Sequence, residues 1–218
     1  MKAGIVIPAL NEEKTIAEVV RSVRPYGEVI VVDDGSSDAT SALAETAGAI
    51  VVRHAANRGY DGALASGFAR AASLKLDAAL SFDADGQHDP AVIARMLAPI
   101  AAGQADLVLG ARPHPARPSE WLFDLYARAQ FGVPDILCGL KAFSASVYCT
   151  HGAAAARRSI NTAMALAAIR SGHRWANVSV PIRPRDGQPR FGSALRANWR
   201  IVKALGGAIA DDFGGMPA

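Results

Sequence analysis

The sequence contains little cysteine and no long hydrophobic run, and both absences limit where the protein works. Cys138 and Cys149 are the only cysteines among 218 residues, too few for a disulfide framework or a zinc cluster. We therefore expect two buried thiols in a reducing cytoplasm. No segment approaches the ~18 consecutive apolar residues of a membrane span. The apolar run at 3–10 is followed by "NEEK" without a signal-peptide cleavage site. These features predict a cytoplasmic protein with no transmembrane segment.

Charges of both signs are present, but they are unevenly distributed. Residues 1–110 carry 9 Lys/Arg and 14 Asp/Glu, whereas residues 151–218 carry 10 Lys/Arg and 3 Asp/Glu. A basic carboxyl-terminal part suits a nucleic acid, an anionic lipid or a phosphorylated small molecule. No nucleic-acid motif and no interleaving of aromatic and basic residues accompanies it, so we expect no nucleic acid partner.

Short β-branched segments alternate with helical patterns along the chain, which predicts an α/β fold with a Rossmann-like, mainly parallel sheet flanked by helices. The first half predicts strands at 3–8, 28–34, 49–54, 77–85 and 105–111. The helices between them are predicted at 12–23, 38–48, 60–74 and 90–103. Beyond a proline-rich loop, the sequence predicts a helix at 122–132, a strand at 140–145, a helix at 160–172, a strand at 175–183 and a final helix. With no repeat and no clear linker, we expect a single domain over residues 1–218.

Polar residues follow several of the predicted strands. The first strand is followed by "PALNEE", the second by Asp33, Asp34, Gly35 and Ser36, and the fourth contains Asp83 and Asp85 at its end. Ligands of open α/β sheets bind beyond the carboxyl ends of the strands, so we expect these residues to line a site. A dinucleotide fingerprint and a Walker loop are both absent. Asp33 alone is expected to form a turn with Ser36.

Asp83 and Asp85 are separated by one residue at the end of a strand. This spacing lets both carboxylates reach one divalent cation, and hard oxygen ligands suit Mg²⁺ or Mn²⁺. Gln87 offers a further oxygen ligand. Such a cation would bridge a diphosphate and neutralise its charge as it leaves.

The ordered motifs resemble the family 2 glycosyltransferases of GT-A fold, in the dolichol-phosphate mannose synthase-like branch that glycosylates polyprenyl phosphates. The resemblance covers about residues 3–193. The segments that match the family motifs are "IPALNEEKTI", "EVIVVDDGSSDAT", "NRGYDGALASGFARA", "LSFDADGQH", "ADLVLGAR", "DILCGLKAFSASV" and "VPIRPRDGQPRFGS".

The resemblance implies roles for the residues that match its motifs. It implies nucleotide-sugar binding for Pro8, Leu10, Asn11, Glu12, Asp34, Asp83, Ala84 and Asp85, with Asp34 reading the base. It implies metal binding, by Mg²⁺ or Mn²⁺, for Asp83, Asp85 and Gln87, and acceptor or diphosphate binding for Arg112, Arg185 and Arg190. The resemblance implies that Asp135 is the catalytic carboxylate on the acceptor side, acting as a general base if the acceptor is a hydroxyl. Residues 1–110 would form the nucleotide-sugar and metal-binding half, and residues 111–218 the acceptor-binding half.

Three positions depart from the family pattern: Leu10 replaces an aromatic residue, Ala163 a glutamate and Pro189 a serine. They leave open which sugar and acceptor are used and whether activity is reduced.

We expect an inverting transferase that moves a hexose from a UDP- or GDP-sugar to a polyprenyl phosphate, with peripheral contact at the inner face of the membrane. The alternatives are a soluble hydroxyl acceptor, a non-catalytic nucleotide-sugar sensor and a nucleotidyltransferase. The last would carry a glycine- and arginine-rich loop where this chain has "PALNEE".

Overall fold

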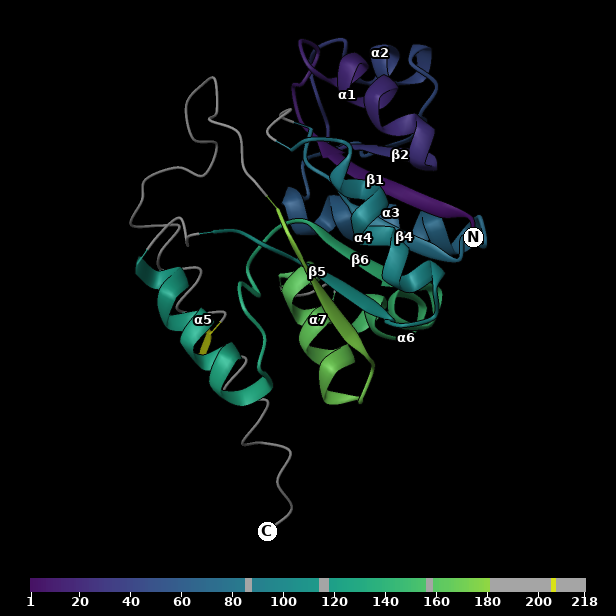
Figure 1. Ribbon diagram of the computed structural model, residues 1–218. Helices are drawn as coiled ribbons and strands as arrows, with labels where there is room; N and C mark the ends of the chain where they lie inside the picture. The colour runs from purple at the N-terminus through teal and green to yellow at the C-terminus, as the bar shows by residue number, and fades with distance from the viewer. Residues whose placement is uncertain (85–87, 114–117, 156–158, 181–204, 207–218) are drawn as a thin grey trace.

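The computed structural model describes residues 1–84, 88–113, 118–155, 159–180 and 205–206, and Figure 1 shows how their elements are arranged. Within these residues, seven strands form one sheet in the order β3-β2-β1-β4-β6-β5-β7. The strands are β1 (Ala3–Ala9), β2 (Glu28–Asp33), β3 (Ile50–Arg53), β4 (Ala78–Ser81), β5 (Leu107–Ala111), β6 (Lys141–Ser144) and β7 (Trp175–Ser179). β6 runs antiparallel to β4 and β5, and the other pairs are parallel. The predicted α/β fold with a mainly parallel sheet is confirmed.

Helices cover both faces of this sheet. They are α1 (Ile16–Val23), which continues into the short 3₁₀ helix η1 (Arg24–Tyr26), α2 (Thr40–Thr46), α3 (Gly59–Ser73), α4 (Val92–Ala101), α5 (Pro118–Phe131), α6 (Ala145–Ala155) and α7 (Ile160–Arg170). Residues of α1, α2 and α4 share one core, and residues of α3, α6 and α7 share the other. α5 lies at the periphery in Figure 1, although Phe123 and Ala127 from it are buried in the same core as α3.

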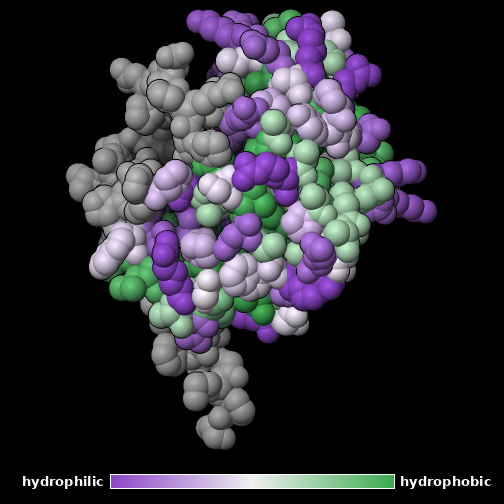
Figure 2. All heavy atoms as spheres, viewed as in Figure 1, coloured by the Kyte–Doolittle hydropathy of each residue, from purple (hydrophilic) through white to green (hydrophobic). Residues whose placement is uncertain are grey.

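The central strands are buried on both faces, which explains their continuous apolar sequence. In β1, Ile5 and Ile7 pack into the core of α1, α2 and α4, whereas Val6 packs into the core of α3, α6 and α7. Alternate residues of a strand point to opposite faces, so both sets must be apolar. Figure 2 shows hydrophilic and hydrophobic residues intermixed over the described part of the visible face. Within the described residues, no helix combines the length and the hydropathy needed to cross a bilayer.

The structure differs from the sequence predictions in several places. β4 ends at Ser81 rather than at residue 85, so Asp83 follows the strand instead of lying in it, and α5 begins at Pro118 rather than at residue 122. α1 begins at Ile16 rather than at residue 12, because Asn11 has a φ of 55° and the next residues form a turn in which Thr15 N donates to Glu12 O. α6 has no counterpart among the predicted elements, and Tyr148 from it packs against Phe68 of α3. Cys149 is exposed, contrary to the expectation of two buried thiols. The predicted final helix lies outside the described residues, as does the end of the strand predicted at 175–183.

Gly67 allows α3 to pack closely on the sheet. A Cβ atom at this position would lie 2.2 Å from Val6 Cγ1 and 3.3 Å from Val32 Cγ2. A glycine inside a helix lowers helix propensity by roughly 1 kcal/mol relative to alanine. The close approach of α3 to β1 and β2 therefore explains why glycine stands here.

We expect Gly67→Ala to lower the free energy of unfolding by about 1–3 kcal/mol, because the added methyl group pushes α3 away from β1. Urea denaturation followed by circular dichroism measures this change. Gly152→Ala in α6 is the matched control, since its Cβ would lie no closer than 3.9 Å to the nearest atom, Met164 Sδ. The control should be neutral or slightly stabilising, and equal losses in both variants would contradict the packing argument.

Candidate functional site

Most of the predicted site residues that the structure describes lie at one edge of the sheet, where the parallel strands end. The loop after β1 carries Leu10–Glu12, β2 ends at Asp33, and Asp83 follows β4. Because β6 is antiparallel, its first residue lies at this same edge. Asp135 precedes β6 and Arg112 follows β5, so groups from both predicted halves of the chain meet here.

Pro8 is buried near the end of the central strand β1, where a missing N–H would normally break a ladder. Val6 O accepts from Phe82 N on the β4 side, and two residues later Pro8 faces the same side. The last β1–β4 pair is Val6 with Ser81, so Pro8 N lies beyond the ladder and no strand bond is lost. Leu10 lies two residues further on and is 39% exposed at the rim.

The loops after β1 and β2 are joined by side-chain hydrogen bonds. Asn11 N donates to Ser36 Oγ at 2.9 Å, and Asn11 Oδ1 accepts from Ser37 N at 3.0 Å. Asparagine tolerates the positive φ that this contact requires better than most residues do. Glu12 is buried, and its N–H donates to Thr40 Oγ1 at 2.7 Å. Asn11 and Glu12 therefore build the wall of the rim between β1 and β2, and their nucleotide contacts stay predictions.

The carboxylate of Asp34 holds the amino-terminal end of α3. Oδ1 accepts from Arg58 N and Oδ2 from Gly59 N, both at 2.8 Å. Oδ1 also lies 2.7 Å from His54 Nδ1, and the other ring nitrogen of His54 lies 2.8 Å from Ser66 Oγ. A carboxylate suits a helix amino terminus because unpaired N–H groups and the helix dipole favour negative charge there. The Asp34 side chain is only 5% exposed, and its predicted contact with a base is not tested by these bonds.

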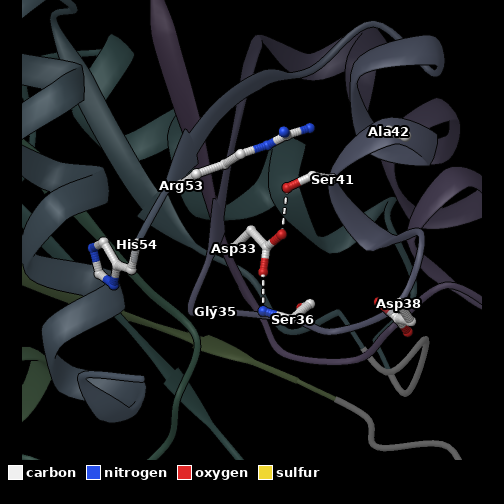
Figure 3. Close-up of a pocket in the computed structure, with 8 residues that line it drawn as sticks. All are labelled: Asp33, Gly35, Ser36, Asp38, Ser41, Ala42, Arg53 and His54. Atoms are coloured by element: carbon white, nitrogen blue, oxygen red, sulfur yellow. Dashed lines mark hydrogen bonds between the residues drawn. The ribbon is translucent and has the colours of Figure 1, made fainter. Parts of the chain in front are cut away.

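Beside Asp34, a pocket of about 310 Å³ lies between the ends of β2 and β3 and helix α2 (Figure 3). Asp33 occupies its floor, where Ser36 N donates to Oδ1 at 2.8 Å and Ser41 Oγ donates to Oδ2. This confirms the predicted turn between Asp33 and Ser36. Burial raises the pKa of Asp33, but the hydrogen bonds from Ser36 and Ser41 outweigh it and leave the pKa below its ordinary value. The other lining residues are Gly35, Asp38, Ala42, Arg53 and His54.

Asp83 is the one predicted metal ligand that the structure describes, because Asp85 and Gln87 lie outside the described residues. Tyr60 Oη donates to Asp83 Oδ1 at 3.1 Å, and His88 Nε2 lies 3.8 Å from Oδ2. Burial, and then the charge of Asp83, raise the pKa of Tyr60 well above its ordinary value, so this phenol stays a donor. The Asp83 side chain is 33% exposed, and a carboxylate oxygen of this kind fits Mg²⁺ or Mn²⁺.

Ala84 differs from its predicted neighbours because its side chain is buried in the core of α1, α2 and α4. Any contact with a nucleotide sugar would use its backbone. Among the described residues, no group of three or more His, Cys, Asp and Glu side chains is arranged to hold a metal ion. The three-residue metal site therefore stays a prediction.

Arg112 and Asp135 form a buried ion pair on the acceptor side of the edge. Arg112 Nε and Nη2 donate to the two oxygens of Asp135 at 2.7 and 2.6 Å, and the Arg112 N–H adds a third bond at 2.8 Å. Nη2 also donates to Glu120 Oε2 at 2.9 Å. Burial lowers the pKa of Arg112, but hydrogen bonds and the charges of the two acids raise it above its ordinary value. Nη1 donates no hydrogen bond within the described residues. Arg185, Arg190 and Pro189 lie outside them.

Lys141 is a buried cation at the start of β6. It is 1% exposed, its Nζ donates to Cys138 O, and it forms no ion pair with any described carboxylate. Burial lowers its pKa to about 8, although the charges of Cys138 and Asp135 raise it. A charge removed from water without a paired partner costs free energy. Lys141 is therefore a destabilising group retained at this edge.

Several polar residues of this edge carried no prediction from the sequence, among them Tyr60, Glu120, Asp124 and Lys141. Tyr60 and Lys141 lie inside segments that carry the family resemblance, "NRGYDGA" and "DILCGLKAF", so that resemblance could have identified them. Glu120 and Asp124 lie in a segment without a motif, and only the folded helix α5 brings them near Arg112. Burial and the charge of Asp135 raise the pKa of Asp124.

The overall fold is similar to that of a protein of known structure. The crystal structure of glucosyl-3-phosphoglycerate synthase from Mycobacterium tuberculosis with Mn²⁺, UDP and glucosyl-3-phosphoglycerate matches with a TM-score of 0.75 and 21% identity, covering 100% of this chain and 81% of that chain. The likeness shows a shared GT-A-like fold.

Residues 4–163 match the family model described as glycosyl transferase family 2, and the chain belongs to this family. An undecaprenyl-phosphate mannosyltransferase of Micrococcus luteus is 32% identical over 165 residues, which are 66% of this chain and 67% of that protein. A UDP-N-acetylglucosamine–dolichyl-phosphate N-acetylglucosaminyltransferase of Methanococcus voltae is 35% identical over 127 residues, which are 50% of this chain and 51% of that protein. The chain thus spans about half the length of the second relative.

The Lys141→Met variant should be more stable than the wild type at pH 7, by up to about 3 kcal/mol for a pKa shift from 10.5 to about 8. Below pH 8 lysine is charged in both states, so the full burial cost is present. Between pH 8 and 10.5 the folded protein has lost a proton that the unfolded chain retains, so wild-type stability rises with pH. The advantage of the variant should therefore shrink over this range.

Urea denaturation of both proteins at pH 7, 8.5 and 10 measures the difference. Lys75→Met is the control, because Lys75 is an exposed residue just beyond the end of α3, and the effect of this substitution on stability should not change with pH. An advantage of Lys141→Met that is constant from pH 7 to 10 would contradict the assigned burial cost.

Proposed function

We propose that the protein transfers a hexose from a UDP- or GDP-sugar to a polyprenyl phosphate, with inversion at the anomeric carbon. The observation that supports this best is the ion pair between Arg112 and Asp135 at the rim that also carries Asp83. The pair engages both oxygens of Asp135 and leaves Arg112 Nη1 without a hydrogen bond among the described residues. Relatives that act on undecaprenyl phosphate and dolichyl phosphate agree with an anionic lipid acceptor.

The donor would bind across the ends of β1, β2 and β4. Asp34 and the joined loops of Asn11 and Ser37 lie where the base would be read, and Asp83 lies where the diphosphate would be held. Tyr60 orients Oδ1 of Asp83, His88 Nε2 lies 3.8 Å from Oδ2, and the side chain is 33% exposed. A bound Mg²⁺ or Mn²⁺, held by Asp83 with Asp85 and Gln87, would neutralise the leaving diphosphate.

The acceptor would approach from the side of β5 and β6. An acceptor oxygen attacks the anomeric carbon, a new carbon–oxygen bond forms, and the bond to the diphosphate oxygen breaks on the opposite side. A phosphate oxygen is already ionised near neutral pH and needs no base, whereas a hydroxyl acceptor needs one. Both Asp135 oxygens already accept from Arg112, and Oδ2 accepts twice, so at most one lone pair of Oδ1 is left to take a proton from a hydroxyl acceptor. The closed pair therefore favours a phosphate acceptor, which Arg112 Nη1 can contact directly.

Asp85→Ala should abolish the Mn²⁺ dependence of UDP or GDP binding, because one of two adjacent metal-binding carboxylates is lost. Calorimetry with each nucleotide, with and without Mn²⁺, tests this, after a panel of UDP- and GDP-sugars has identified the donor. Asp89→Ala is the control, since Asp89 Oδ1 accepts from Ala91 N at the start of a helix. Unchanged Mn²⁺ dependence in Asp85→Ala would overturn the metal site, and binding without release of diphosphate would indicate a sensor.

Arg185→Ala and Arg190→Ala should each raise the KM for a polyprenyl phosphate by about tenfold, the loss of one charge-assisted phosphate contact. The KM for the nucleotide sugar should change much less. Transfer of radiolabelled sugar to the lipid phosphate, with Arg174→Ala as the exposed control, provides both constants. If both variants lose donor affinity with and without acceptor, these arginines hold the leaving diphosphate instead.

A further inference from the structure

The chain between Asp135 and Lys141, here called the 135–141 segment, is held by side chains where the sheet ends. Ser81 and Lys141 are the last paired residues of β4 and β6 on this side. Two residues before Lys141, Gly139 O accepts from Ser81 Oγ at 2.7 Å and from Asn161 Nδ2 at 3.0 Å. Side-chain donors thus replace the ladder bonds that the strands no longer supply.

The amide of Asn161 can serve this role in one orientation only. Its Nδ2 faces Gly139 O, which can only accept, and also lies 3.0 Å from Ser81 Oγ. A flipped amide would place its oxygen against the Gly139 carbonyl, so the nitrogen must lie there. Ser81 Oγ–H then donates to the same carbonyl while its oxygen accepts from Asn161. Both Nδ2 protons are used, and the residue is 4% exposed.

Gly139 lies against the donor side of the edge. A Cβ atom at this position would be 3.4 Å from Asp83 Oδ2 and 3.5 Å from Tyr60 Oη. The opposite end of the segment carries Asp135, and Cys138 N donates to Asp135 O at 3.1 Å. A displacement of Gly139 would therefore change where the Arg112–Asp135 pair lies relative to Asp83.

Helix α7, which carries Asn161, is itself fixed to the same part of the molecule. Its first N–H group, on Ile160, donates to Asp61 Oδ1 at 3.0 Å. Asp61 follows Tyr60 in the first turn of α3. The helix that orients Asp83 through Tyr60 thus also sets the position of Asn161.

We propose that Asn161 is a positioning residue, whose amide fixes Gly139 and with it the placement of the Arg112–Asp135 pair relative to Asp83. This inference rests on the proposed transfer from a donor at Asp83 to an acceptor at Arg112. Asn161 touches neither substrate in this arrangement. Its loss should disturb alignment of the two substrates more than the binding of either one.

Asn161→Ala and Asn161→Asp should each lower kcat for sugar transfer by at least about tenfold, while the KM of donor and acceptor change by less than about threefold. Aspartate matches the shape of asparagine but has no protons to donate to Gly139 O, so it should not rescue. Thr162→Val is the matched control, because Thr162 is the adjacent buried polar residue of α7 and its side-chain hydroxyl forms no hydrogen bond within the described residues. An unchanged kcat in both Asn161 variants would overturn the proposal.

A second measurement does not depend on catalysis. Cys138 is 1% exposed within the 135–141 segment, whereas Cys149 is exposed. In a Cys149→Ser background, Asn161→Ala should raise the rate at which Ellman's reagent labels Cys138 by about tenfold, and Thr162→Val should not. Urea denaturation of each variant separates this local opening from global loss of stability. Unchanged protection of Cys138 would overturn the proposal, whereas faster labelling in a protein whose wild type transfers no sugar would overturn only the proposed function.

Discussion

The capture of the amino terminus of α3 by the Asp34 carboxylate is the contact on which the geometry of this edge depends most. A buried carboxylate is costly to remove from water, and two backbone N–H groups with His54 Nδ1 compensate that cost. The bond fixes the first turn of α3 next to the end of β2. Tyr60 and Asp61, in that turn, then orient Asp83 and cap α7.

The reversed direction of β6 is the second condition for a site. In a wholly parallel sheet, the residues that precede a strand lie at the edge opposite to those that follow its neighbours. Since β6 is antiparallel to β4 and β5, its start lies beside their ends. Asp135 therefore meets Arg112, and the 135–141 segment lies beside Asp83 although more than 50 residues separate them in the sequence.

The charged side chains at this edge differ in whether they have an ion-pair partner. Arg112 is paired with both Asp135 and Glu120, whereas Lys141 is buried without an ion pair among the described residues and the Asp83 side chain is 33% exposed. A paired arginine is rigid and still has Nη1 to offer to an anion, whereas the exposed carboxylate suits a cation. Groups that suit a cation and an anion thus lie at the same edge of the sheet, which is the arrangement that the proposed transfer from a diphosphate to a phosphate needs.

The sequence by itself determined the α/β class, most of the strands and the acids at their ends, because hydrophobic periodicity and turn residues act over a few positions. Through a family resemblance that local motifs carry, it also predicted roles for Asp83, Arg112 and Asp135, and these roles stay predictions. It did not place α6, the true start of α1, or the pairing of Arg112 with Asp135 and Glu120. Those features depend on contacts between distant segments: Phe68 against Tyr148, Glu12 against Thr40, and Glu120 against Arg112. Only the tertiary structure decided that Asn161 reaches Gly139, since a hydrogen bond between a helix and a loop 22 residues apart leaves no periodic signal in the chain.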